Sequence, residues 1–156
     1  MAKQKLFPCL WIEKDAKKAV KYYLSIFKSG KMLSYKAYKN SGTASGDFDV
    51  AEMELLGMKF QILAAGPMFK FNEAVSFSIV CKDQDEVDYY WKALTAKGGS
   101  EGPCGWCKDK YGLSWQVIPE QLYKLENHKV KAKQEYAFKA MMKMKKIIIA
   151  DLEEKK

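Results

Sequence analysis

The sequence Gly57-Met58-Lys59-Phe60-Gln61-Ile62-Leu63 recurs later in the chain as Gly112-Leu113-Ser114-Trp115-Gln116-Val117-Ile118. Both copies follow one pattern: a glycine, two variable residues, an aromatic residue, a glutamine and two aliphatic residues. A second echo precedes each copy, because Val20-Lys21-Tyr22-Tyr23-Leu24 returns as Val87-Asp88-Tyr89-Tyr90-Trp91. Two pairs of matching phrases in the same order indicate a duplicated structural unit.

The elements around these phrases also repeat. Apolar periodicity, turn residues and the cap signals of Asp15 and Asp83 predict one strand, one helix and three antiparallel strands in each half. After Pro119 the pattern becomes helical. The expected strands are 6–13, 31–39, 48–56, 58–65, 74–81, 104–108 and 113–118, and the expected helices are 15–30, 83–99, 120–126 and 131–144.

These elements predict an α+β protein with paired βαβββ modules and C-terminal helices. We expect a first module at 1–65, a linker at 66–73, a second module at 74–119 and a helical extension at 120–156, all within one structural domain. A four-stranded module buries only one sheet face. We therefore expect the two modules to form a cupped mixed sheet, with a pocket in the shared concave face.

Composition limits the possible partners. The net charge is +8, and all 27 basic residues are lysine. Bidentate reading of guanine favours arginine, so specific nucleic-acid recognition is not expected. Lysines gather in residues 124–156, which is typical of a solvated helix face. No apolar run approaches the roughly 20 residues that span a bilayer, and the polar start of the chain favours a cytoplasmic protein without a membrane partner.

Several local phrases narrow the assignment: Pro8–Trp11, Gly66–Phe77, Cys104–Trp106 and Asp109–Gln116. Together with the paired modules, they resemble the vicinal oxygen chelate superfamily of glyoxalase I, extradiol dioxygenases and bleomycin-resistance proteins. The phrases are similar to its PhnB-like branch, often labelled "3-demethylubiquinone 3-methyltransferase". The resemblance covers residues 6–152. No glycine-rich strand-to-helix turn that would bind S-adenosylmethionine is visible, so the sequence does not support the methyltransferase label.

The resemblance implies a divalent metal held by the first and fourth strands of each module, usually through His or Glu. The fourth-strand positions fall on Gln61 and Gln116, and the first-strand positions fall within a residue of Pro8 and Phe77. Glutamine is a neutral and poor ligand for such ions. Cys9 is the only soft donor near these positions, and the single histidine lies far away in the lysine-rich segment. We therefore expect no metal and no cofactor.

The same residues suggest a small-molecule site. Both glutamine amides can donate and accept hydrogen bonds, and nearby aromatic rings can stack on a flat ligand. The alternative is that the glutamines only support packing and the rings belong to the core. Glu52 and Glu54 lie on a strand of the predicted cup but can equally face solvent. The predicted ligand-binding residues are Gln61, Gln116, Trp11, Phe77 and Trp106.

Three functions remain open from sequence. The first is a homodimeric protein that binds a small molecule, with no catalytic residue assigned. The second is a metal-assisted enzyme with atypical ligands drawn from Cys9, Gln61 and Gln116. The third is an interaction protein acting through its methionine-rich C-terminal helix. Cys104 and Cys107 have the spacing of a redox pair, but they precede a strand and turn, so we expect structural cysteines.

Overall fold

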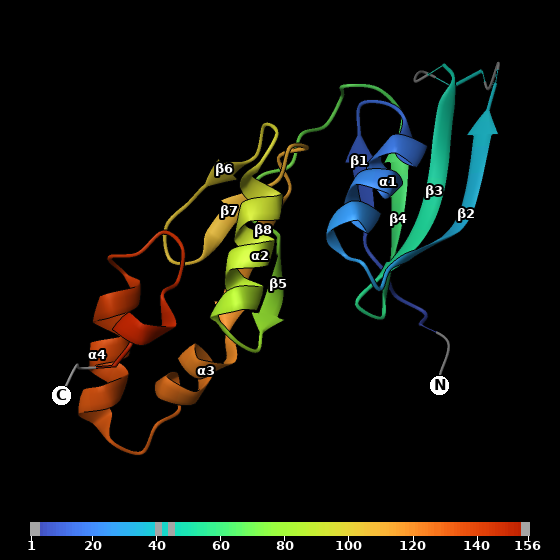
Figure 1. Cartoon of the computed structure of the whole chain (residues 1–156). Helices are drawn as coiled ribbons and strands as arrows, with labels where there is room; N and C mark the ends of the chain where they lie inside the picture. The colour runs from blue at the N-terminus through green and yellow to red at the C-terminus, as the bar shows by residue number, and fades with distance from the viewer. Residues whose placement is uncertain (1–3, 40–41, 44–45, 154–156) are drawn as a thin grey trace. The chain divides into compact units, whose positions relative to one another are not determined.

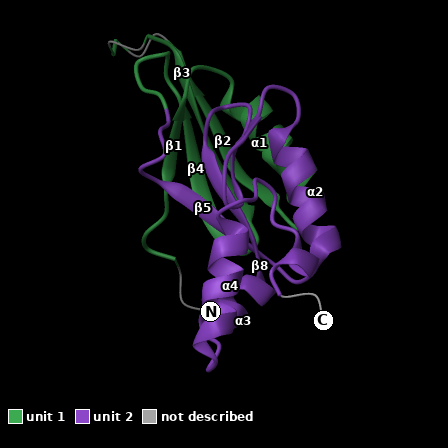
Figure 2. Cartoon of the chain, turned by 90° about the vertical axis from the view of Figure 1, so that its left-hand side faces the viewer, with its two compact units in different colours: residues 1–70 green, residues 71–156 purple. Residues whose placement is uncertain are grey.

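The computed structural model of the chain describes residues 4–39, 42–43 and 46–153. The chain divides into two compact units, Met1–Lys70 and Phe71–Lys156, which Figure 2 shows in different colours. Their boundary falls inside the segment 66–73, for which the sequence predicts a linker. The division of the chain into two modules, a linker and an extension stays a prediction at this level of detail.

The first unit is a βαβββ module whose elements follow the predicted order (Figure 1). Its strands form one sheet in the order β1-β4-β3-β2. The outer strand β1 runs parallel to β4, and the other neighbours are antiparallel. The elements are β1 (Cys9–Ile12), α1 (Ala16–Ile26), β2 (Lys31–Tyr38), β3 (Phe48–Leu55) and β4 (Met58–Ala64).

One face of this sheet is covered by α1. The helix begins where the Asp15 carboxylate accepts a hydrogen bond from the amide of Lys18 at 2.8 Å, as the sequence predicts for an N-cap. The core lies where apolar side chains of the helix and of three strands are buried together. Its most buried members are Ala16, Ala19, Val20, Tyr23, Ala51, Met53 and Ile62. Because strand side chains alternate, the intervening residues form the opposite, helix-free face.

The repeated glycine has a backbone role in both copies. Leu55 and Met58 are strand partners, so Leu56 and Gly57 form a two-residue hairpin loop. Their φ angles are 48° and 81°, as a type I′ turn requires. Gly112, the counterpart of Gly57, has a φ of 82°. A Cβ atom at either glycine would meet nothing within 4 Å, so the left-handed backbone, and not lack of space, favours glycine here.

The second unit repeats the arrangement. Its sheet has the order β5-β8-β7-β6, with β5 parallel to β8. The sequence predicts three antiparallel strands in this half but assigns no residues to the one at β6, because two residues in a glycine-rich segment are too few to show alternation. Helix α2 covers one face of the sheet, where Cys81 and Val117 are fully buried. The elements are β5 (Ser76–Cys81), α2 (Gln84–Thr95), β6 (Ser100–Glu101), β7 (Trp106–Lys108) and β8 (Ser114–Pro119).

The C-terminal part of the second unit contains α3 (Glu120–Glu126), α4 (Lys131–Met141) and the short helix η1 (Ile149–Asp151). Both predicted helices are present, although the second ends three residues earlier than expected. Met141 and Met144 of the methionine-rich C-terminal segment pack against a buried cluster. That cluster consists of Ile118, Leu122, Leu125, Ala137, Ile147 and Leu152.

The α+β class, the paired βαβββ modules and the C-terminal helices are therefore confirmed. The joining of the two sheets into one cup stays a prediction.

Candidate ligand-binding surfaces

The two repeated glutamines occupy matching places in the two units. Gln61 on β4 is the strand partner of Cys9 and of Glu52. Gln116 on β8 is the strand partner of Ser78 and of Trp106. Both glutamines are partly buried, and the residues that follow them along the chain are fully buried under the helices. The glutamines therefore lie on the face of each sheet opposite α1 or α2, called the helix-free face here, although C-terminal helices contact it at Ile118 and Ser78 in the second unit.

The helix-free face of the first unit carries a polar row across all four strands, formed by Cys9, Gln61, Glu52 and Ser34. The Lys59 ammonium lies 2.8 Å from the Glu52 carboxylate. This hydrogen bond is the main reason why the pKa of Glu52 lies below its usual value, and hydrogen bonds from Ser34 and Gln61 act in the same direction. The Glu52 carboxylate therefore stays ionised, and the Lys59 ammonium balances its charge.

Trp11 lies on the same face of the first sheet, two residues beyond Cys9 on β1. Its indole N–H donates to the backbone oxygen of Gly66 at 2.8 Å. The ring also meets Phe69 edge to face, with the centroids 4.9 Å apart. These contacts hold the predicted stacking residue against the segment that follows β4. Cys9 is exposed, and partial burial of its thiol raises the thiol pKa.

The helix-free face of the second unit has a different chemistry. Gln116 donates from its amide nitrogen to the Ser76 hydroxyl at 2.8 Å. The hydroxyls of Ser78 and Tyr123 are 3.3 Å apart. Trp106 takes the register position that Glu52 takes in the first unit, so an indole ring stands beside the glutamine in place of a carboxylate.

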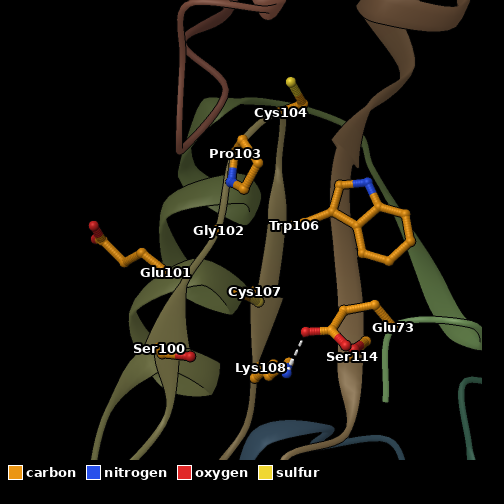
Figure 3. Close-up of a pocket in the computed structure, with 10 residues that line it drawn as sticks. All are labelled: Glu73, Ser100, Glu101, Gly102, Pro103, Cys104, Trp106, Cys107, Lys108 and Ser114. Atoms are coloured by element: carbon orange, nitrogen blue, oxygen red, sulfur yellow. Dashed lines mark ion pairs between the residues drawn. The ribbon is translucent and has the colours of Figure 1, made fainter.

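A pocket of about 520 Å³ lies in the second unit (Figure 3). Its size is within the range of small-molecule sites. Among the described residues that line it, Lys108 is the only basic one, and its ammonium lies 2.5 Å from the Glu73 carboxylate. Its lining is supplied by Glu73, Ser100, Glu101, Gly102, Pro103, Cys104, Trp106, Cys107, Lys108 and Ser114.

Ser114 is an unusual member of this lining. The residue is 1% exposed, and its hydroxyl has no hydrogen-bond partner among the described residues. It is the strand partner of Lys108, so the two polar side chains lie next to each other on one face. A buried hydroxyl without a partner costs about 1–3 kcal/mol. Such a group in a pocket wall marks a place where a ligand can supply the missing hydrogen bond.

Phe77 lies elsewhere. Alternation along β5 places it with Ile79 and Cys81 on the helix-covered face. Its ring lies 5.6 Å from that of Trp115, measured between centroids. Four of the five predicted ligand-binding residues thus share helix-free faces within their own units, and Phe77 does not. Register decides this, because a shift of one residue reverses the face of a strand side chain.

Sequence reasoning missed Asp109 as a structural residue. Its carboxylate is 1% exposed and accepts hydrogen bonds from the amides of Tyr111 and Leu113 and from the indole of Trp115. These bonds fix the turn between β7 and β8, and with it the position of Lys108 one residue earlier. An aspartate shortly before a tyrosine–glycine turn was the available signal.

The cysteine pair does not fit redox chemistry. Cys107 is 3% exposed, and burial raises its thiol pKa to about 12. A reactive thiol needs a lowered pKa. Cys104 lies in the turn before β7 with a φ of 54°, and its sulfur is 3.7 Å from that of Met142.

The donor set also fits a family-type metal poorly. The face-sharing partners of the two glutamines are Cys9 and Ser78, so only the first unit offers a soft ligand there. Glu52 stands beside Gln61 but is bound by Lys59. No group of three His, Cys, Asp or Glu side chains within the described residues is placed to share an ion. Within the part of the chain that the structure describes, the strand partners of the two glutamines therefore differ from the His and Glu ligands that the resemblance implies.

The paired βαβββ modules are shared with proteins of a known family. A family model described as "3-demethylubiquinone-9 3-methyltransferase" matches residues 4–118. The chain therefore belongs to this family, within the PhnB-like branch of the vicinal oxygen chelate superfamily. Curated proteins gave no match.

Solved structures give the same fold. A PhnB protein from Bacillus cereus, titled a putative 3-demethylubiquinone-9 3-methyltransferase, is 26% identical with a TM-score of 0.64. The match covers 74% of this chain and 99% of that chain. A glyoxylase/bleomycin resistance protein/dioxygenase domain from Frankia sp. EAN1pec is 13% identical with a TM-score of 0.53, and the match covers 76% of this chain and 93% of that chain.

A third match is to a fosfomycin resistance protein, FosX from Listeria monocytogenes, solved as a variant with Mn(II) and 1S,2S-dihydroxypropylphosphonic acid. It is 16% identical with a TM-score of 0.53, and the match covers 74% of this chain and 90% of that chain. At this identity the likeness concerns the fold alone.

Among the described residues of the present chain, no helix is long and apolar enough to cross a membrane.

Proposed function

We propose that this protein binds a small, flat organic molecule without a metal ion, and that the main contact surface is the helix-free face of the second unit. The observation that carries this proposal is the pocket of about 520 Å³, which combines the Trp106 ring with the buried, unpartnered hydroxyl of Ser114. An aromatic wall and a free polar group are what a site needs to hold and orient such a ligand.

The proposal keeps the predicted roles of Gln116 and Trp106 and places them on one sheet face. Gln116 donates to Ser76 through its nitrogen, and its amide oxygen offers acceptor capacity. Gln61 and Trp11 form a comparable polar and aromatic surface on the first sheet, and we propose them as a second contact surface. Phe77 is left out because it lies on the helix-covered face.

No reaction is part of the proposal. We do not propose the methyltransferase activity in the family's description, because the two strand-to-helix turns of this chain, 13–15 and 82–83, contain no glycine. Its sheets are also not the doubly wound parallel sheets that bind nucleotide-like cofactors. Metal-assisted chemistry is likewise not proposed, given the donor set described above.

A thermal-shift screen with flat aromatic compounds tests the proposal. A ligand that binds only the folded state at 100 times its Kd adds about 2.7 kcal/mol to the free energy of unfolding, which gives a clear rise in Tm. We expect hits on the wild-type protein, confirmed by calorimetry. Trp106→Ala should weaken each hit at least tenfold.

The matched control is Phe138→Ala. Phe138 is 54% exposed on α4 and does not line the pocket, so its loss should leave the affinities unchanged. Equal weakening by both substitutions, or no compound that stabilises the wild-type protein, would count against the proposal. Elemental analysis of the purified protein is the accompanying check. A stoichiometric transition metal would favour the metal-assisted alternative.

We also propose that the protein is a homodimer. The edge strand β2 supports this, because its apolar side chains Met32, Leu33 and Tyr35 are each 42–43% exposed. A second copy would cover such a surface. Light scattering coupled to gel filtration measures the mass directly, and a mass of one chain at micromolar concentration would contradict the dimer.

A further inference from the structure

The ion pair between Lys108 and Glu73 lies at the pocket, and its two side chains differ in solvent exposure. The Lys108 side chain is 35% exposed, whereas that of Glu73 is 65% exposed. Lys108 belongs to β7, and Glu73 belongs to the turn that precedes β5. The cation is thus fixed in the sheet, and the anion reaches it from a loop (Figure 3).

Such a pair is easily exchanged. An ion pair with one exposed partner contributes at most about 1 kcal/mol, since water solvates the released carboxylate. Glu73 can therefore leave Lys108 at low cost when another anion takes its place. Lys108 would then keep a partner, and no buried charge would be left alone.

The other groups of the pocket favour an anion with an aromatic body. The hydroxyl of Ser114, strand partner of Lys108, has no hydrogen-bond partner in the described parts of the chain and can donate to the same anion. The second acid, Glu101, accepts from the Trp91 indole at 3.0 Å and pairs with Lys145, so its charge is already engaged. Beside these polar groups, Trp106 offers an aromatic surface.

We propose that the ligand of this pocket is a flat aromatic compound carrying one anionic group, and that Glu73 occupies the position of that group until the ligand displaces it from Lys108. This inference rests on the proposed binding function and names its ligand class. The anion would receive hydrogen bonds from the Lys108 ammonium and the Ser114 hydroxyl, while the ring would lie against Trp106.

A matched pair of probes tests the inference. 2-Naphthalenesulfonate carries the anion, and 2-naphthalenesulfonamide has nearly the same shape without the charge. We expect the sulfonate to bind the wild-type protein more tightly than the sulfonamide. Lys108→Met should weaken the sulfonate at least tenfold and leave the sulfonamide within about twofold. Glu73→Gln should tighten the sulfonate severalfold, because the competing carboxylate is gone.

The control is Glu120→Gln, which removes an exposed carboxylate paired with Lys124 away from the pocket. It separates the local competition from a general change in net charge, and it should leave both affinities unchanged. The folded state of each variant is checked by its unfolding transition.

The outcomes separate the inference from the proposed function. If both probes bind equally through Trp106 and Glu73→Gln changes neither affinity, the anionic ligand class is wrong and the binding function stands. If Glu73→Gln weakens the sulfonate, the displacement is wrong. If neither probe binds any variant at millimolar concentration, the binding function itself is contradicted at this pocket.

Discussion

Glu52 and Trp106 occupy the same register position in the two modules, each directly opposite the repeated glutamine on the neighbouring strand. In the first module this position holds a carboxylate that forms an ion pair with Lys59. In the second it holds an aromatic ring beside a pocket. The duplicated backbone has therefore kept its geometry while the chemistry of its two helix-free faces has diverged.

The hairpin loop of the first module can be stabilised by one substitution. Leu56 has a φ of 48° and is 55% exposed, so a bulky side chain occupies a left-handed position without making core contacts. Asparagine is favoured in the first loop position of a type I′ turn. We expect Leu56→Asn to raise the free energy of unfolding by about 0.5–1 kcal/mol, measured by urea denaturation.

Gly57→Ala is the control and should have the opposite effect. Gly57, the second loop residue, has a φ of 81°, so alanine at this position should lower the free energy of unfolding by about 1 kcal/mol. A destabilising Leu56→Asn would show that the turn has another geometry.

Ser114→Ala should separate stability from binding. Removing a buried hydroxyl that has no partner should raise the free energy of unfolding by about 1 kcal/mol. The same change should weaken the proposed anionic ligand, because one of its donors is lost. Urea denaturation and calorimetry measure the two effects. A variant that is less stable than the wild-type protein would mean that the hydroxyl has a partner in solution.

The four thiols should differ in reactivity. Burial raises the thiol pKa of Cys81 and Cys107 to about 12, so both stay protonated and shielded at mildly alkaline pH. Cys9 is exposed and Cys104 partly so. We expect iodoacetamide to modify Cys9 and Cys104 in the native protein, and all four only after denaturation. Peptide mass spectrometry reads each site, and native labelling of Cys107 as fast as Cys9 would contradict the burial described.

Acid should weaken the first unit through Glu52. Its pKa in the folded protein is lowered, so its contribution to stability is complete above the usual glutamate value of about 4.3 and is lost as pH falls through the lowered pKa. Glu52→Gln should therefore flatten the dependence of Tm on pH in this acidic range. Glu54→Gln is the matched control on the same strand, where the carboxylate lies 3.4 Å from Lys31. Equal effects of both variants would contradict a special role for Glu52.

Much of the fold was predictable because its signals are local. The Asp15 and Asp83 caps, the periodic helices and the turn glycines each depend on a few neighbouring residues, and the structure contains all of them. The position of strand β6 was not predicted, because its pairing with β7 depends on distant backbone groups and not on its own two residues.

The candidate site was harder to predict. The repeated phrase led to Gln61 and Gln116, whose helix-free position follows from burial of the next residue in each copy. Phe77 was assigned to the same surface because the sequence does not fix strand register to one residue. The ion pair between Lys108 and Glu73 could not be predicted from the sequence, because 35 residues separate these two charged side chains and only folding brings them together.

Proton–nitrogen correlation spectra of the four tryptophan indoles test the central claim, that a small molecule binds beside Trp106, most directly. During titration with 2-naphthalenesulfonate, we predict a saturable shift of the Trp106 indole signal. The Trp115 signal should stay in place, because its ring lies on the helix-covered face and its N–H donates to the buried carboxylate of Asp109. A Trp106 signal that does not move, or moves only together with that of Trp115, would contradict the claim.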